Sequence, residues 1–266
     1  MTNLRVAPQA AIDGFRASPV SYYGTAAVGG AAGGPAGSTS MTFFCVVYPK
    51  KLAAGVSQVL FNRGNIGGNG WNIYQSGSAV LAIVYRTAGT FASVSTGGLV
   101  NGNWDGLSGL FQPHILLASY QQVGGNSTLD MWINDRQPAQ SVIAGLGFNP
   151  YAGPTTIGVV SNANLYNATD IAVGDCGFLD GYNPTTFVST TFGNGAPGLI
   201  KSWQEDFRQG RYLTWPRAAV ANSDWHWAAK DVVVGPTVRP TWTDRYSATA
   251  MLRFGSPQGA SFPALL

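Results

Sequence analysis

The chain has 266 residues, of which 45% are hydrophobic and 10% are charged, so it can bury a sizeable core and is not disordered as a whole. Its length fits one large domain with an elaborated tail better than two equal halves, because all-β sandwiches often reach this size. The formal net charge is +3 and the longest run of basic residues is Lys50 and Lys51, which argues against a nucleic-acid-binding protein.

The first residues lack a basic region followed by an apolar segment, and no apolar stretch is long enough to span a membrane. We therefore expect no secretion signal, no membrane insertion and synthesis in a cytoplasm. The two cysteines, Cys45 and Cys176, are too few for a disulfide scaffold or a metal cluster. We expect two buried thiols that pack as small hydrophobic side chains, and no metal or other cofactor.

Residues 1–40 end in a Gly/Ala-rich stretch and are expected to form an N-terminal arm or connector. From Met41 onward, short segments rich in β-branched and aromatic residues alternate with Gly, Asn or Pro, which predicts an antiparallel meander. These segments are TFFCVVY, VLFNRG, WNIYQSG, AVLAIVYRT and FASVSTGG. The Gly-rich residues 64–70 connect two of them and precede no helix, so they predict a hairpin loop and not a phosphate-binding loop.

Residues 129–133 alternate apolar and polar side chains, which predicts a half-buried strand. Asn134 and Asp135 follow, and both tolerate the left-handed backbone of a turn, so a hairpin is expected there.

A single helix is predicted at residues 197–212, where Pro197 suits the first turn. Its apolar residues recur at three- and four-residue intervals: Leu199, Ile200, Trp203 and Phe207. Residues 213–266 contain prolines that interrupt regular structure, and they predict an extended tail that docks on another surface. The candidate docking residues are Trp225, Trp227 and Trp242.

The segments VLFNRG, WNIYQSG, HILLASYQQVGGNSTLDMWINDRQ, TTIGVV and DCGFLDGYN together resemble the laminin-G-like branch of the concanavalin A-like lectin/glucanase superfamily. In that family a strand ending in Tyr precedes a short loop, an alternating strand and an Asn-Gly turn. Here Tyr120, the loop at 124–127 and the pair Asn134-Asp135 stand at those places, with Asp135 as a departure from Gly. Ile157-Gly158 matches a later family strand, and residues 177–180 match its closing strand loosely.

The resemblance covers residues 41–185 and implies an all-β fold, an antiparallel two-sheet jelly-roll sandwich. The sandwich with its short helix is expected to span residues 41–212, followed by the extended tail at 213–266. The resemblance also implies that the strands of Cys45 and Cys176 lie in the same sheet, which would bring the two thiols into one neighbourhood.

The residues do not support catalysis. Glucanases of this superfamily cleave with two carboxylates, whereas the single glutamate here, Glu205, lies in the predicted helix. Asp170 and Asp175 differ in parity and would not point the same way from one strand. The two histidines have structural interpretations: His114 begins a strand, and His226 stands between two tryptophans as a packing anchor. We expect no catalytic residue.

A sugar site would combine an exposed aromatic ring with amide or carboxylate groups. Two pairs meet this description: Asn69 with Trp71, and Trp104 with Asp105. The alternative for each is a Trp that packs over the core. Asn101, Asn103 and Asp105 offer oxygen ligands to calcium, but their spacing is not that of an EF-hand, and a plain Asn/Gly turn is the alternative.

These observations favour a non-enzymatic virion structural protein of a tailed bacteriophage, a capsid decoration, head-fibre or tail component. Low charge, abundant Gly, Ala, Thr and Asn, and the Trp/Pro-rich tail favour this interpretation. The expected partners are other virion proteins and further copies of the chain in a symmetric homo-oligomer. The alternatives are an adhesin that binds a host-surface glycan and a glycan-degrading enzyme.

Overall fold

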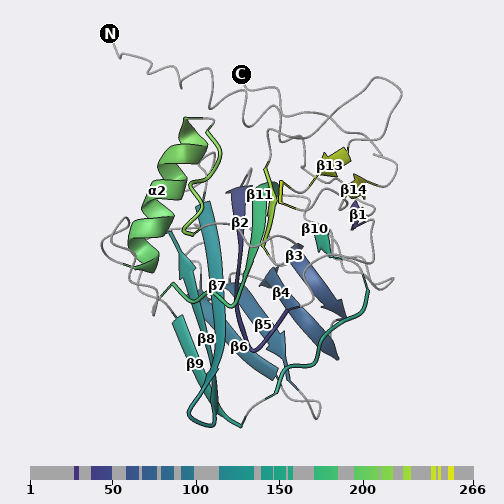
Figure 1. Ribbon diagram of the computed structural model, residues 1–266, viewed down its shortest axis with the longest axis vertical. Coiled ribbons are helices and arrows are strands. Elements are labelled where there is room, and N and C mark those ends of the chain that lie inside the picture. Colours follow the sequence, from purple (N-terminus) through teal and green to yellow (C-terminus); the bar gives the residue numbers. More distant parts are fainter. Residues whose placement is uncertain are drawn as a thin grey trace.

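Figure 1 shows the computed structural model, in which two antiparallel sheets pack face to face and one helix covers the outer face of the larger sheet. This arrangement confirms the predicted jelly-roll sandwich. The structure describes residues 27–29, 37–49, 58–65, 68–76, 79–86, 91–98, 114–134, 139–145, 147–153, 155–157, 171–184, 195–209, 211–217, 224–228, 241–243, 245–246 and 251–254.

The larger sheet has six strands, and every neighbouring pair is antiparallel. In order across the sheet they are β12 (Trp225–Trp227), β11 (Ile171–Asp180), β2 (Ser40–Pro49), β7 (His114–Val123), β8 (Asn126–Ile133) and β9 (Ala139–Ala144). β7 and β8 are joined by Gly124 and Gly125, whose φ angles of 61° and 83° are those of a tight hairpin turn that favours glycine. The predicted loop at 124–127 is therefore shorter than expected. Asn134 has a φ of 56° and confirms the predicted turn after β8.

The smaller sheet of the sandwich has five strands. In order they are β10 (Thr156–Ile157), β3 (Gln58–Asn65), β4 (Asn69–Ser76), β5 (Ala79–Tyr85) and β6 (Phe91–Gly98). β3 to β6 form the predicted meander, but β2 does not belong to it and lies instead between β11 and β7 in the other sheet. Residues 41–47 of β2 are fully buried, and a strand buried on both faces belongs in the middle of a sheet that is covered on both sides.

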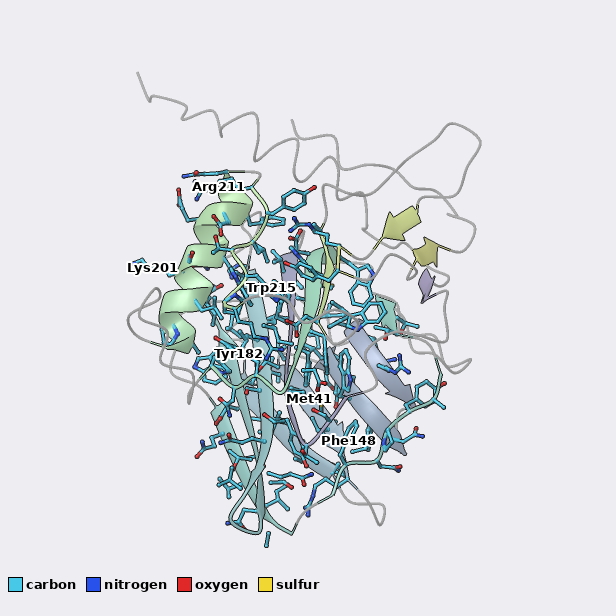
Figure 2. All side chains as sticks on the ribbon, in the orientation of Figure 1. Met41, Phe148, Tyr182, Lys201, Arg211 and Trp215 are labelled. Atoms are coloured by element: carbon cyan, nitrogen blue, oxygen red, sulfur yellow. The ribbon has the colours of Figure 1, made fainter. Side chains whose placement is uncertain are left out.

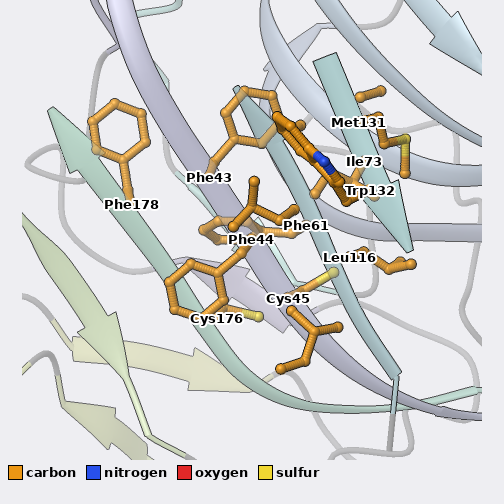
Figure 3. Close-up of a cluster of buried hydrophobic side chains, with 14 of the residues drawn as sticks. Phe43, Phe44, Cys45, Phe61, Ile73, Leu116, Met131, Trp132, Cys176 and Phe178 are labelled. Atoms are coloured by element: carbon orange, nitrogen blue, oxygen red, sulfur yellow. The ribbon is translucent and has the colours of Figure 1, made fainter. Parts of the chain in front are cut away.

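The main core fills the space between the two sheets. Phe43 of β2 packs against Trp71 of β4 with ring centroids 4.6 Å apart, and Trp71 also stacks on Phe178 of β11 and contacts Phe61 of β3. Figure 3 shows this cluster from within. Each such buried aromatic or aliphatic side chain contributes about 1.5–3 kcal/mol, so this layer dominates the stability of the sandwich.

A second core lies between the six-stranded sheet and helix α2 (Ala196–Arg208), which confirms the predicted helix except that it ends four residues earlier. Its apolar face buries Leu199, Ile200, Trp203 and Phe207. Asp206 in the last turn ties the helix to the chain that follows it, because its carboxylate accepts hydrogen bonds from the Arg211 side chain and from the Thr214 N–H.

Phe44 of β2 carries the contact between α2 and the sheet, since its ring lies 4.3 Å from that of Trp203. The ring also lies against Gly177, where a Cβ atom would stand 2.3 Å from the phenyl carbon Cε1. Gly177 therefore lacks a side chain because Phe44 occupies its place.

Cys45 and Cys176 are directly opposite each other on β2 and β11, which confirms the expectation that their strands share a sheet. Both are free, buried thiols. Burial raises the pKa of each thiol, because the apolar surroundings disfavour the thiolate.

The C-terminal region departs from the predicted docking tail. β12 pairs with β11, Trp225 and Trp227 are buried, and their rings stack 5.5 Å apart, so the interpretation of these two residues as docking groups is wrong. Trp242 lies in β13, but its side chain is outside the described residues. A three-stranded sheet that the sequence did not predict joins β1 (Ala27–Gly29), β14 (Met251–Phe254) and β13 (Thr241–Thr243).

Candidate functional site

The outer face of the five-stranded sheet carries a row of five side chains, four of which are polar. The strand registers place one residue of each strand in this row: Thr156, Asn62, Asn72, Ile83 and Ser93. Successive residues of a strand point to opposite faces, and the neighbours Phe61 and Trp71 point into the core. The row must therefore lie on the face turned away from the core.

Asn62 and Asn72 form the centre of the row and have incomplete hydrogen bonding. The Asn62 side-chain amide nitrogen donates to Thr156 Oγ1 at 3.0 Å, whereas its Oδ1 has no hydrogen-bond partner in the described part of the chain. Asn72 is 2% exposed, and neither its Nδ2 nor its Oδ1 has a hydrogen-bond partner among the residues that the structure describes. A buried polar group without a hydrogen-bond partner lowers the free energy of unfolding by about 1–3 kcal/mol. The two asparagine side chains therefore destabilise the fold, and the need to fold does not explain why they are there.

Aromatic side chains flank the two asparagines on the same face. Tyr74 stands two residues along β4 from Asn72 and is partly exposed, while Tyr85 of β5 contacts Phe91 of β6 edge-on at 6.3 Å. Burial raises the pKa of the Tyr74 phenol, and the nearby Tyr85 phenol raises it further. Phe91 is 51% exposed, so this face of the sheet has buried amides at its centre and an exposed ring beside the row, on the edge strand β6.

The hairpin between β3 and β4 contributes no side chain to the face beside Asn62. Gly64 and Gly70 are paired there and carry no side chain. Gly70 has a φ of 86°, and a Cβ on it would lie 1.9 Å from the Arg63 carbonyl oxygen. The adjoining segment holds the hairpin, because Gly70 N–H donates to the Asn149 carbonyl and the Asn149 side chain donates to the Gly68 carbonyl.

The structure does not support the first predicted sugar-binding pair, and the second lies outside the described residues. Trp71 is fully buried in the core, so its ring offers no surface to a sugar, and Asn69 lacks the exposed aromatic partner predicted for it. Trp104 and Asp105 lie outside the described residues, as do Asn101 and Asn103 of the possible calcium site.

The asparagines at the centre of the row were missed by the sequence analysis. Asn72 directly follows Trp71, and a strand turns adjacent residues to opposite faces. The alternation of WNIYQS, with Trp71 and Ile73 on one parity and Asn72 and Tyr74 on the other, was the available signal.

A second polar cluster lies on the helix side of the six-stranded sheet. His226 Nε2 lies 2.8 Å from Asp175 Oδ2, Trp215 stacks over the imidazole at 5.2 Å, and the Arg245 guanidinium lies 3.4 Å from His226 Nδ1. This pair resembles part of a hydrolytic triad, but both residues are buried and His226 is fully so. The cluster packs the chain around Trp215, which Figure 2 labels beside α2.

His114 likewise has a structural role, because its Nδ1 lies 2.8 Å from the side-chain nitrogen of Asn134, which also accepts a hydrogen bond from the Ile115 N–H through Oδ1. Among the described residues no group of three His, Cys, Asp or Glu side chains is arranged to hold a metal ion. The described part of the chain also contains no helix that is long and apolar enough to cross a membrane.

Comparison with known proteins gives only structural similarities. No protein-family model and no curated protein matches the chain. Among solved structures, domains LG4-5 of the mouse laminin α1 chain are similar with a TM-score of 0.42 and 10% identity, over 59% of this chain and 39% of that one. The binding domain of botulinum neurotoxin serotype C1 is similar with a TM-score of 0.39 and 10% identity, over 65% and 37%. The chain thus spans less than two fifths of either structure.

Proposed function

We propose that this chain is a non-enzymatic carbohydrate-binding module that works as a component of a tailed-phage virion. The observation that carries the binding function is the row on the outer face of the five-stranded sheet, with the partnerless amide of Asn72 at its centre. The fold itself carries no function, because jelly rolls serve many unrelated roles.

A carbohydrate fits this face better than a purely apolar or ionic ligand. A sugar hydroxyl both donates and accepts hydrogen bonds, so it can satisfy the Oδ1 and Nδ2 atoms of Asn72 together. The aromatic side chains beside the amides offer apolar surface to the carbon face of a sugar ring, and Phe91 is the exposed one. No charged side chain stands in the row.

Four of the described carboxylates make structural contacts, which supports a non-enzymatic role. Asp175 is paired with His226, Asp224 accepts hydrogen bonds from Arg217 and Trp215, and Asp206 is paired with Arg211. Glu205, the single glutamate of the chain, lies exposed on α2 and accepts a hydrogen bond from Gln209. Glycoside hydrolysis would require two carboxyl groups about 5–10 Å apart across a substrate.

The binding function is tested by Asn72→Leu, measured on a glycan array and then by calorimetry with a glycan that the chain retains. We expect loss of binding together with an unchanged or higher free energy of unfolding, because the substitution removes two buried polar atoms that have no partner. Asn126→Leu makes the same chemical change at an exposed position of the six-stranded sheet and is the matched control.

Two results would contradict this part of the proposal. One is a chain that retains no glycan on the array. The other is full binding by Asn72→Leu, which would place the binding surface elsewhere. A loss of stability in Asn72→Leu would instead assign Asn72 a structural role.

The virion setting is supported by composition: low charge and abundant Gly and Ala fit a chain that packs among many copies and neighbours. Docking on those neighbours does not use Trp225 or Trp227, which the chain buries itself. Mass spectrometry and antibody-labelled electron microscopy of purified particles test this setting, with the chain expected as a stoichiometric component on the particle surface. Particles that lack the chain would refute it and leave the binding function intact.

A further inference from the structure

The six-stranded sheet ends in an edge strand, β9, that offers backbone hydrogen-bonding groups to a partner. Among the described residues, β9 pairs with β8 on one side and with no strand on its other side. The opposite edge strand, β12, is partly covered, because the Arg245 N–H donates to the His226 carbonyl at 3.1 Å. An uncovered edge is a ready template for another strand.

The hydrogen-bond pattern shows which groups of β9 face outward. Gly145 N–H donates to the Gly125 carbonyl at 2.8 Å, so this pair is hydrogen-bonded, and hydrogen-bonded pairs recur at every second residue of an antiparallel ladder. Ser141 and Ile143 therefore direct their backbone groups at β8. The tight turn at Gly124 and Gly125 leads to the same assignment, because a two-residue hairpin closes on a hydrogen-bonded pair at Val123 and Asn126.

It follows that Gln140, Val142 and Ala144 direct their N–H and C=O groups away from the sheet. The Arg86 guanidinium reaches one of these groups and donates to the Ala144 carbonyl at 3.0 Å. The backbone groups of Gln140 and Val142 have no partner within the described part of the chain.

The side chains of β9 do not protect this edge. Its sequence, AQSVIA, contains no charged residue and no proline, which are the usual means of preventing edge-to-edge pairing. Val142 is 57% exposed and lies at the centre of the outward-facing groups.

We propose that β9 pairs with β9 of a second copy of this chain, antiparallel about a two-fold axis that passes beside Val142. In this register Val142 faces Val142 of the other copy and forms two hydrogen bonds with it. The Ala144 N–H of each copy donates to the Gln140 carbonyl of the other. The two six-stranded sheets then join into one continuous sheet.

A second copy fits this edge because the pairing is self-complementary. Antiparallel pairing of β9 with itself places the same uncharged residues on both sides of the axis and brings two exposed valines together. The contact closes after two copies, since each edge covers the other. The proposal is independent of the ligand, because it uses the six-stranded sheet and not the face that carries Asn72.

The oligomeric state of the purified full chain tests the proposal through Val142→Pro. Proline removes an N–H that points outward and leaves the β8 ladder unaffected, so we expect a folded monomer, with a mass that falls from twice 27.9 kDa to 27.9 kDa in light scattering. Val142→Lys keeps the N–H but places two cations together, and it should also give a monomer if the proline variant fails to fold. Val142→Thr keeps shape and N–H and should remain a dimer.

A disulfide trap tests the register. Val142→Cys places two thiols on facing residues, where the Cα atoms of a hydrogen-bonded pair are about 5.5 Å apart and within reach of a disulfide. Mild oxidation with oxidised glutathione should therefore link two copies through Cys at position 142, releasing two equivalents of reduced glutathione. Thr128→Cys, one strand inward on the same face, is the control and should not crosslink, since its two copies would stand three strand spacings, roughly 14 Å, apart.

A wild-type chain that stays monomeric at high concentration would overturn the proposal. So would a dimer that survives both Val142→Pro and Val142→Lys, because its interface would then lie elsewhere. A dimer that dissociates in these variants but crosslinks equally through both cysteine positions would refute the register.

Discussion

Asp130 is a buried carboxyl group on the outer face of the six-stranded sheet. It is 3% exposed, lies opposite Ser119 of β7, and accepts a hydrogen bond from the Gln140 side chain at 2.6 Å. Burial raises its pKa, and the Gln140 hydrogen bond offsets part of the rise. The native state therefore binds this proton at higher pH than the unfolded chain does.

We predict that Asp130→Asn removes a pH dependence of stability. Because the folded pKa is raised, the contribution of Asp130 is most favourable below the unfolded pKa of about 4 and is lost as the pH rises through the folded value. Chemical unfolding of both proteins at a series of pH values should show the variant gaining stability relative to the wild type as the pH rises through this window. A stability difference that does not change with pH would contradict the assignment.

Gly177→Ala is predicted to weaken the contact between the sheet and α2. The added methyl group would lie 2.3 Å from the Phe44 ring and 3.1 Å from the Trp225 carbonyl oxygen, so the ring must shift. Overpacking of this kind costs about 1–3 kcal/mol, measured as a lower midpoint of urea unfolding. Gly181→Ala is not a usable control because of its positive φ, whereas Ser95→Ala on an exposed strand position should have little effect. An unchanged midpoint in Gly177→Ala would show that Phe44 moves freely.

At single positions the sequence predicted which types of side chain form the candidate site better than it predicted which face of the sheet they occupy. The sequence-based prediction identified the strand that contributes to the row, since Asn69 and Trp71 lie within β4. It selected alternate residues of that strand that face the core, however, and not the residues between them. A shift by one residue reverses the face of every side chain in a strand, so residue type without register cannot identify a surface. Asn62 could not be identified as part of the site from local sequence, because its position beside Asn72 depends on the pairing of β3 with β4.

The elements themselves were largely predictable, because local pattern determines them. The strands β3 to β8 and the helix follow from alternation, three- and four-residue spacing and turn residues. β12 was missed because WHW is short and lies among prolines, and its strand conformation arises from pairing with β11. Propensity carries little information for an element that tertiary contacts stabilise.

For helix α2, Trp203 is the residue that holds it to the sheet. Its ring packs on Phe44, stacks near Trp215, and its indole N–H donates to the Thr214 carbonyl at 2.7 Å. We predict that Trp203→Ala lowers the free energy of unfolding by about 3–5 kcal/mol, measured by urea denaturation. Lys201→Ala, on the exposed side of the same helix, should stay within about 0.5 kcal/mol of the wild type. A small effect of Trp203→Ala would show that α2 contributes little to the fold.

For the molecule as a whole, the boundary of the sandwich is testable by truncation. The sequence placed it after residue 212, whereas β12 pairs with β11 and Trp215 covers His226. A chain that ends at Tyr212 would lose β12 and leave Asp175 buried without His226, so we predict that it does not unfold cooperatively. A chain that ends at Ala228 keeps both and should show a single thermal transition. Cooperative unfolding of the shorter chain would restore the predicted boundary.

The order of strands in the two sheets could not be predicted from local pattern, because β2 pairs with β7 and β11 across long stretches of chain. The resemblance supplied the sandwich, and the cysteine expectation followed from it correctly, since Cys45 and Cys176 are opposite each other. The polar face of the five-stranded sheet depends on these long-range strand pairings, so it could not be predicted from the sequence.

The fit of the Phe44 ring over Gly177 links two positions that are 133 residues apart in the chain. In divergent homologues we expect the sizes of these two residues to covary: a methyl or larger group at position 177 should accompany a smaller residue at position 44. An aligned set of such sequences would reveal this compensation as a coupled pair, and the pair would identify the neighbouring strands β2 and β11 without any coordinates.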